Sequence, residues 1–213
     1  MSSIEPRSLK RWVMPRIRPE RKAERRAQIV AAARTCFARS GFHNATLQDV
    51  FAEAGLSAGC VYNYFRSKDE LMLAIAEERH EDERRLIAAA SEVDDPVAAL
   101  RQIAQRFAEQ YLKDDGLDKR RIALQTWSEA QINPFILSSV RAGMDGPRAQ
   151  LAQLIRRGQA AKRLTSTHDA DAIAHIIIAL LHGSVLQKLW KPDIDNDTQF
   201  AVFEHFLRSL ETE

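Results

Sequence analysis

Three closely spaced helix-start signals between residues 46 and 70 constrain the fold more than any other feature of the chain. Thr46-Leu-Gln-Asp49 and Ser67-Lys-Asp-Glu70 are of the capping-box type, and the Ser57 hydroxyl is placed to accept a hydrogen bond from first-turn amides. Gly41 and Gly55 follow apolar helical patterns and suit the left-handed residue that ends a helix. These signals predict a helix ending at Gly41, short helices over about 46–54 and 58–65, and a longer helix from Ser67 to about Ala90.

The apolar periodicity of the rest of the chain from Glu20 onward is also helical. From Glu20 onward one face carries Ile29, Ala33, Cys36, Phe37 and Ser40. Five or six longer helices are expected after Ser91, over about 95–112, 118–132, from Asn133-Pro134 onward, 169–190 and 197–210. Pro147 lacks an N–H group and is expected to kink or break the helix that begins at Pro134. The predicted fold class is all-α.

Composition excludes several alternatives. Eight Gly and seven Pro are few for an all-β chain, and Cys36 and Cys60 lie in apolar helical patterns rather than in a spaced set of thiols. We therefore expect no disulfide framework, metal site or cofactor. The most apolar run, Ile173–Leu186, is shorter than a membrane helix, and the basic N-terminus has no apolar signal core. The expected location is the cytoplasm, with no membrane partner.

Positive charge is concentrated in the first third of the chain. Residues 1–68 hold 13 Lys and Arg against 5 Asp and Glu, whereas the remainder holds 18 against 24, although the whole chain has a net charge of only +2. A chain with one basic end suits a polyanionic partner. Nucleic acid is the first candidate.

The two short helices over 46–65 have the arrangement of a helix-turn-helix, whose second helix enters the major groove of DNA. Tyr62, Asn63 and Tyr64 are expected on or near its exposed part, Lys68 opens the next helix, and Gly59 removes a side chain where backbone must come close. Tyrosine hydroxyls and lysine bind phosphates, and asparagine pairs with the edge of adenine.

The stretch from Ala45 to Leu71, ATLQDVFAEAGLSAGCVYNYFRSKDEL, closely resembles the DNA-binding signature of the tetracycline-repressor (TetR) family of bacterial regulators. The resemblance covers about a quarter of the chain, and the preceding helix from Ile29 to Phe42 also fits. It implies a helix-turn-helix DNA-binding domain over 20–68 and a larger helical effector-binding and dimerisation domain over 69–213. Residues 1–19 contain Pro6, Pro15 and Pro19 among basic side chains and have no apolar periodicity, so we expect a basic flexible arm there.

By that resemblance nine residues are candidates for contact with DNA. Thr46, Tyr62, Tyr64 and Lys68 would contact phosphates, and Ser57, Ala58, Gly59, Cys60 and Asn63 would face the groove. The chain departs from the common family pattern at Ala58, Cys60 and Asn63, so that its operator cannot be taken from a relative.

Each assignment has an alternative. Phe65 suits the core, and three aromatics within four positions cannot all face one core, so at least one of them points outward. Cys60 suits a small groove-facing side chain better than a redox switch. The basic residues of the N-terminal segment either increase solubility or follow the minor groove; these are Lys10, Arg11, Arg16, Arg18, Arg21 and Lys22.

The last two predicted helices are strongly apolar. The helix over 169–190 is apolar nearly all the way round and must be buried on several sides. Two such helices from each of two chains would form a four-helix bundle that spaces two recognition helices on DNA. The candidate dimer residues are Ile177, Leu181, Leu189, Phe203 and Phe206. The alternative is that these side chains only close the core of one chain.

Polar and aromatic groups on the middle helices suggest a small-molecule site. The candidate effector-binding residues are Tyr111, Trp127, Gln131 and His175. The resemblance implies a homodimeric repressor that an effector of unknown identity releases from a quasi-palindromic operator, with the helix from Ser67 as the connecting element.

Other function classes fit less well. The sequence contains no Gly-x-Ser-x-Gly, P-loop, HExxH or Gly-x-Gly-x-x-Gly motif, so we do not expect an enzyme. An architectural DNA binder or a protein-interaction module without an effector stays open. Such a binder would hold most DNA similarly, whereas a regulator should keep its specificity ratio as salt is added.

Overall fold

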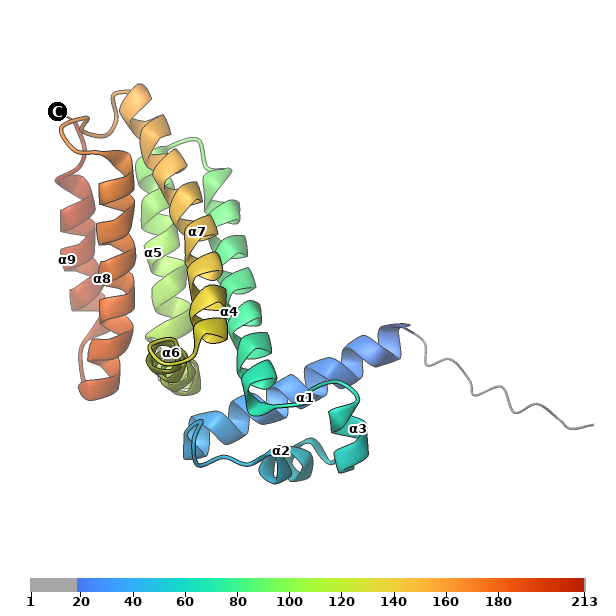
Figure 1. Cartoon of the computed structure of the whole chain (residues 1–213). Coiled ribbons are helices and arrows are strands. Elements are labelled where there is room, and N and C mark those ends of the chain that lie inside the picture. Colours follow the sequence, from blue (N-terminus) through green and yellow to red (C-terminus); the bar gives the residue numbers. More distant parts are fainter. Residues whose placement is uncertain (1–18, 213) are drawn as a thin grey trace, which may run out of the picture.

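A computed structural model describes residues 19–212, and within this range the chain is all-helical (Figure 1). Nine α-helices and one 3-10 turn make up this part of the chain. Their bounds are α1 Pro19–Ser40, α2 Leu47–Ala54, α3 Ala58–Tyr62, α4 Lys68–Ser91, α5 Pro96–Tyr111, a 3-10 turn Asp114–Gly116, α6 Leu117–Glu129, α7 Pro134–Ala160, α8 Ala170–Trp190 and α9 Asn196–Arg208. Figure 1 shows α1, α2 and α3 at the foot of a bundle formed by the long helices from α4 to α9.

The capping residues predicted from the sequence determine where the first helices begin and end. Thr46 and Asp49 form the complete capping box of α2, and Ser57 Oγ accepts a hydrogen bond from the Cys60 amide at 3.3 Å. Gly41 and Gly55 have φ angles of 81° and 63°, the left-handed conformation that lets the chain turn without a Cβ clash. The predicted helix-turn-helix is therefore confirmed.

α3 is shorter than predicted. It ends at Tyr62, because the Tyr64 and Phe65 amides both donate to the Val61 carbonyl and close a tight turn. Val61 and Phe65 are buried, whereas Asn63 is exposed at the C-cap.

α7 continues through Pro147, so that, of the predicted kink or break, the break does not occur. Pro147 forgoes one bond to the helix ladder, and its ring would crowd the carbonyl four residues earlier. That earlier residue is Gly143, which lies directly against the His80 ring of α4. Tight packing of α7 on α4, together with the burial of Pro147, holds the helix together on both sides of the proline.

Two apolar clusters make up the interior, and α4 contributes to both. The first joins α1, α2 and α3 to the start of α4 and includes Ile122 of α6 and Ile136 of α7. The second fills the bundle from the end of α4 to Leu210. Because the first cluster already includes α6 and α7, the DNA-binding part is packed directly onto the bundle.

Candidate nucleic-acid interface and effector cavity

The exposed surface of α3 and its flanks carries most of the predicted DNA contacts. Ser57, Ala58, Gly59, Tyr62 and Asn63 are exposed, and Cys60 and Tyr64 are half-buried. Tyr62 is 49% exposed, and its ring packs edge-on against Phe51 with 5.4 Å between centroids. The Phe51 contact directs Tyr62 away from the core, and Phe65 takes the buried position.

Three of the predicted contact residues already bond within the protein. Thr46 Oγ1 donates to Asp49 at 2.7 Å and accepts from the Asp49 amide, and the Ser57 hydroxyl caps α3. Lys68 Nζ donates to the carbonyls of Phe42, His43 and Ala45 at 2.8, 3.1 and 2.9 Å. An ammonium group has three N–H donors, so Lys68 is fully engaged in tying the α1–α2 loop to the start of α4.

The start of α1 adds a basic wall beside α3. Arg21, Lys22 and Arg25 line a groove together with Cys60, Asn63 and Tyr64. Arg21 and Lys22, predicted to belong to the basic N-terminal residues, lie in the first turns of a helix that begins with Pro19. Proline at the first helical position was the signal that could have located this start. The other basic residues of that segment, from Lys10 to Arg18, lie outside the described residues.

Polar contacts connect α1 and its following loop to the bundle. Gln125 Nε2 of α6 donates to the Phe37 carbonyl at 2.9 Å, and His43 Nε2 lies 2.7 Å from the nearly buried Glu129 carboxylate. Arg34 of α1 is paired with Glu78 of α4. These contacts tie α1 and its following loop to α6 and α4 through specific bonds.

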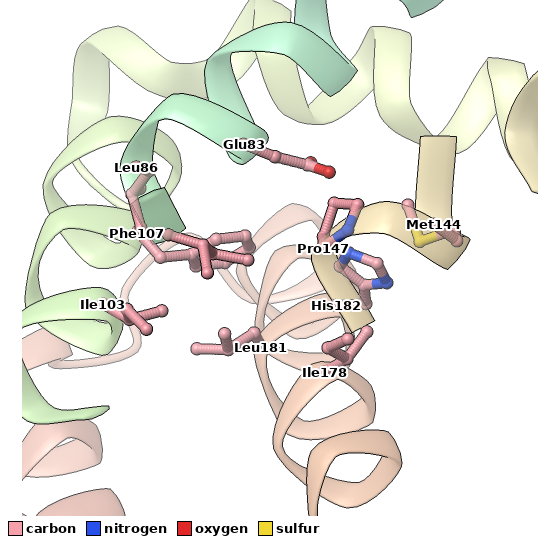
Figure 2. A pocket seen from close by; sticks show the side chains of 10 residues that line it. Glu83, Leu86, Ile103, Phe107, Met144, Pro147, Ile178, Leu181 and His182 are labelled. Carbon is pink, nitrogen blue, oxygen red and sulfur yellow. The ribbon is translucent and has the colours of Figure 1, made fainter. Parts of the chain in front are cut away.

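A small apolar cavity lies within the bundle (Figure 2). Its lining comes from α4, α5, α7 and α8 and consists of Glu83, Leu86, Ile87, Ile103, Phe107, Met144, Pro147, Ile178, Leu181 and His182. Figure 2 shows the Glu83 carboxylate and the His182 ring at the same end of the cavity as Pro147. An apolar space with a few polar groups at one end is typical of a site for a small molecule.

A buried polar cluster closes that end. Arg79 Nη1 donates to Glu83 Oε1 at 2.9 Å, and the Tyr111 hydroxyl donates to the same oxygen at 3.4 Å. The Trp127 ring lies 5.8 Å from the Arg79 guanidinium and 5.0 Å from the His182 ring. Burial raises the pKa of Glu83, and it lowers the pKa of His182 to about 4, so that His182 is neutral at pH 7.

The predicted effector residues fall into two groups. Tyr111 and Trp127 contact the polar cluster at the end of the cavity, whereas Gln131 and His175 are exposed and do not line it. Phe107, Met144 and Pro147 were not among the candidates. Proline inside a helix was the available signal for α7, since a buried proline marks a place where another group packs closely.

α8 presents an apolar stripe to solvent. Ile176 and Leu180 are 53% and 42% exposed, and Trp190 and Val202 of α9 are more exposed still. The stripe consists of Ala172, Ile176, Ala179, Leu180, Gly183 and Trp190, and the polar Gln187 lies on the same exposed face. The candidate Ile177 is instead buried in the chain's own core, and Leu181, Leu189, Phe203 and Phe206 are half-buried.

Within residues 19–212, α8 is also the helix long and apolar enough to cross a membrane, a test that a covered helix of a globular assembly passes equally.

Two family profiles match the chain. One, described as bacterial regulatory proteins of the tetR family, matches residues 29–75. The other, described as the C-terminal part of BetI-type transcriptional repressors, matches residues 96–211. Together they cover the helix-turn-helix and the bundle.

Individual relatives agree. The transcriptional regulator TtgR of Pseudomonas putida is 29% identical over 187 residues, which are 84% of this chain and 87% of TtgR. A regulator from Saccharomonospora viridis, solved in complex with choline, superimposes with a TM-score of 0.77 at 26% identity, over 90% of this chain and 99% of that one. SmeT, the repressor of a Stenotrophomonas maltophilia multidrug efflux pump, shares the fold with a TM-score of 0.73 at 22% identity over 88% of this chain and 90% of its own.

Proposed function

Since the chain belongs to the TetR family of bacterial transcriptional regulators, with a DNA-binding helix-turn-helix, and is not an enzyme, we propose that it is a homodimeric repressor, acting in the cytoplasm, that a small molecule releases from a quasi-palindromic operator. One observation carries the proposal. α4 begins at Lys68, which holds the α1–α2 loop, and about four turns further along it provides Glu83, Leu86 and Ile87 to the apolar cavity. A ligand in the cavity would therefore act on the helix that positions the DNA-binding part.

The DNA-binding unit in this proposal is residues 20–68, with 69–213 as the effector and dimerisation part. Tyr62, Tyr64 and the groove-facing residues of α3 would meet DNA, and Arg21, Lys22 and Arg25 would add phosphate contacts. Lys68 would act by positioning the loop, because its donors are already occupied.

The dimer would form through the exposed stripe of α8 together with α9. Ile176 and Leu180 are large apolar side chains that a lone chain leaves in water, and Ala179 and Gly183 allow a second helix to approach closely. Two-fold pairing through this stripe places two copies of α3 on one DNA.

We propose that the effector is a small, mostly apolar and uncharged molecule with one hydrogen-bonding group. The lining offers eight apolar side chains, a neutral His182, and a Glu83 carboxylate whose charge Arg79 already balances. Choline, which the Saccharomonospora viridis regulator binds, is the informative comparison. A quaternary ammonium would have to compete with Arg79 for Glu83, so we expect uncharged apolar probes to bind more tightly.

The experiment is to select genomic duplex fragments with the full-length protein at near-physiological salt and to repeat the selection with Tyr62→Ala. We expect one inverted-repeat motif, lost in the variant. A panel of uncharged aromatic alcohols, with choline beside them, is then tested for release of the selected duplex and for an increase in unfolding temperature. Phe107→Ala, in the cavity wall, should change the response, and Gln131→Ala, at an exposed position outside the cavity and the α8 stripe, should not. Fragments without a shared motif would contradict the repressor proposal.

A further inference from the structure

The helix-turn-helix carries no positive side chain. From Gly41 to Phe65 the sequence contains no Lys and no Arg, while Asp49 and Glu53 add two negative charges. In the major groove the usual reader of guanine is an arginine or lysine that donates to O6 and N7. α2 and α3 therefore lack the side chains that recognise G·C pairs in this way.

The groove-facing side chains of α3 are small and apolar. Ala58 is exposed and ends in a methyl group, Gly59 has open space around it, and Cys60 is half-buried with a small thiol. Groups of this kind make favourable contacts with the C5-methyl group of thymine and cannot satisfy the hydrogen-bonding edge of guanine.

Two polar groups remain at the groove, the Ser57 hydroxyl, which caps α3 by accepting from the Cys60 amide, and the Asn63 carboxamide. Asn63 is exposed at the C-cap of α3, and Asn is a bidentate partner for N6 and N7 of adenine. Methyl contacts with thymine and a carboxamide that pairs with adenine thus both favour A·T pairs.

Positive charge lies beside α3 rather than on it. Arg21, Lys22 and Arg25 form the α1 wall of the groove that Cys60 and Asn63 complete. Long cationic side chains at the edge of a reading helix suit the phosphates that flank the bases. Charge and base readout are therefore carried by different helices.

We propose that α3 reads A·T pairs, through thymine methyl groups at Ala58 and Cys60 and the adenine edge at Asn63, with α1 supplying the charge. The proposal rests on the proposed function, in which α3 enters the major groove of an operator. It assigns a base-pair class to each half-site, which the family relationship leaves open because this chain departs from its relatives at these three positions.

The test removes single methyl groups from the DNA. After selection of the operator, each thymine of one half-site is replaced in turn by deoxyuridine, and each adenine by 7-deazaadenine, and Kd is measured at fixed salt. We expect about fourfold weaker binding at each contacted thymine, the effect of losing one buried methyl. A larger loss, about tenfold, is expected at one adenine, where a hydrogen bond of Asn63 disappears.

Variants of Ala58 test whether this residue is responsible for the loss of affinity at one thymine. Ala58→Gly should abolish the methyl sensitivity at one thymine and leave the other unchanged, whereas Ala58→Arg should shift selection toward guanine at that position. Ala52→Gly, an equally exposed alanine on α2, controls for helix weakening and should keep both sensitivities.

An inverted repeat whose sites opposite α3 are G·C pairs, and whose affinity is unchanged by deoxyuridine, would overturn the readout proposal and leave the repressor proposal standing. Retention of fragments without a shared motif would overturn both.

Discussion

Arg79 and Glu83 form a buried ion pair across one turn of α4, with Nη1 and Oε1 2.9 Å apart, and each faces a different cavity. Glu83 lines the apolar cavity of the bundle, whereas Arg79 lines a second cavity that Arg34 of α1 also borders. A ligand that displaces Glu83 would therefore disturb Arg79 and, through it, the junction with α1. This pair links the effector cavity to the second cavity, which borders the DNA-binding part.

Single and double variants of Arg79 and Glu83 should show that the two residues are energetically coupled. Glu83→Gln leaves the Arg79 charge buried without a counter-ion, and we expect a loss of about 3 kcal/mol in the free energy of unfolding. Adding Arg79→Met removes the orphaned charge and should restore most of that loss. Urea denaturation of the four proteins measures the coupling, and additive effects of the two changes would show that the pair does not act as a unit.

Stability should also fall as pH falls from 7 to 5. Burial, together with the Arg79 charge, lowers the pKa of His80 from 6.5 to about 4, and Arg79 Nη2 lies 2.9 Å from His80 Nε2. Between pH 6.5 and 4 the unfolded chain therefore binds a proton at His80 that the folded chain does not. The contribution of neutral His80 to the free energy of unfolding is lost as the pH falls through that range. We expect a loss of about 2 kcal/mol from His80 between pH 7 and 5.

Denaturation at several pH values tests this dependence. His80→Gln keeps an acceptor for Arg79 without a titrating ring, and it should flatten the curve by about the amount assigned to His80. His175→Gln, at an exposed position, should leave the curve unchanged. An unaltered slope in His80→Gln would mean that another group titrates.

Two glycines of α7 that look alike in the sequence should respond oppositely to alanine. A Cβ on Gly143 would lie 2.0 Å from His80 Nδ1, whereas a Cβ on Gly146 meets only Arg84 Cδ at 3.8 Å. We expect Gly143→Ala to destabilise the protein by about 2 to 3 kcal/mol through overpacking. Gly146→Ala should be neutral or stabilise it by up to about 1 kcal/mol, because alanine restricts the unfolded chain. Thermal unfolding of both variants gives the comparison, and a neutral Gly143→Ala would show that α7 and α4 can separate freely.

The parts of the fold that local chemistry determines were predictable. Capping groups and left-handed glycines act within four residues, so Thr46, Ser57 and Gly55 located the helix-turn-helix from sequence alone. The continuity of α7 was not predictable, because the cost of Pro147 is offset by packing of Gly143 on a helix sixty residues earlier.

The sequence also could not predict which faces of the apolar helices are buried and which are exposed. α8 is apolar nearly all the way round, so its pattern does not tell which side chains meet the core and which are left for a partner. The structure buries Ile177 and exposes Ile176, one residue away. Similarly, Lys68 was identified by its place in the signature, but its bonds to three carbonyls depend on how the α1–α2 loop folds over α4.

Lys68→Met should separate a positioning role from a phosphate contact. Because Lys68 Nζ donates to three carbonyls, we expect lower thermal stability and weaker operator binding, with an unchanged slope of log affinity against log salt. A lost phosphate contact would instead reduce that slope by about one. Arg25→Met, in the basic groove of α1, is the matched comparison and should reduce the slope while leaving stability unchanged.

The stripe on α8 should control assembly. Leu180 is 42% exposed in the isolated chain, so Leu180→Glu should preserve the helical content measured by circular dichroism while placing two charges in the proposed interface. We expect the dimer to weaken at least about 100-fold and operator binding to fall with it, because one copy of α3 reads only one half-site. Ile132→Glu changes a more exposed apolar residue in the turn between α6 and α7, outside the α8 stripe, and should remain dimeric. Sedimentation velocity over a concentration series distinguishes the states, and a Leu180→Glu variant that stays as dimeric as the unmodified protein would move the interface off this face of α8.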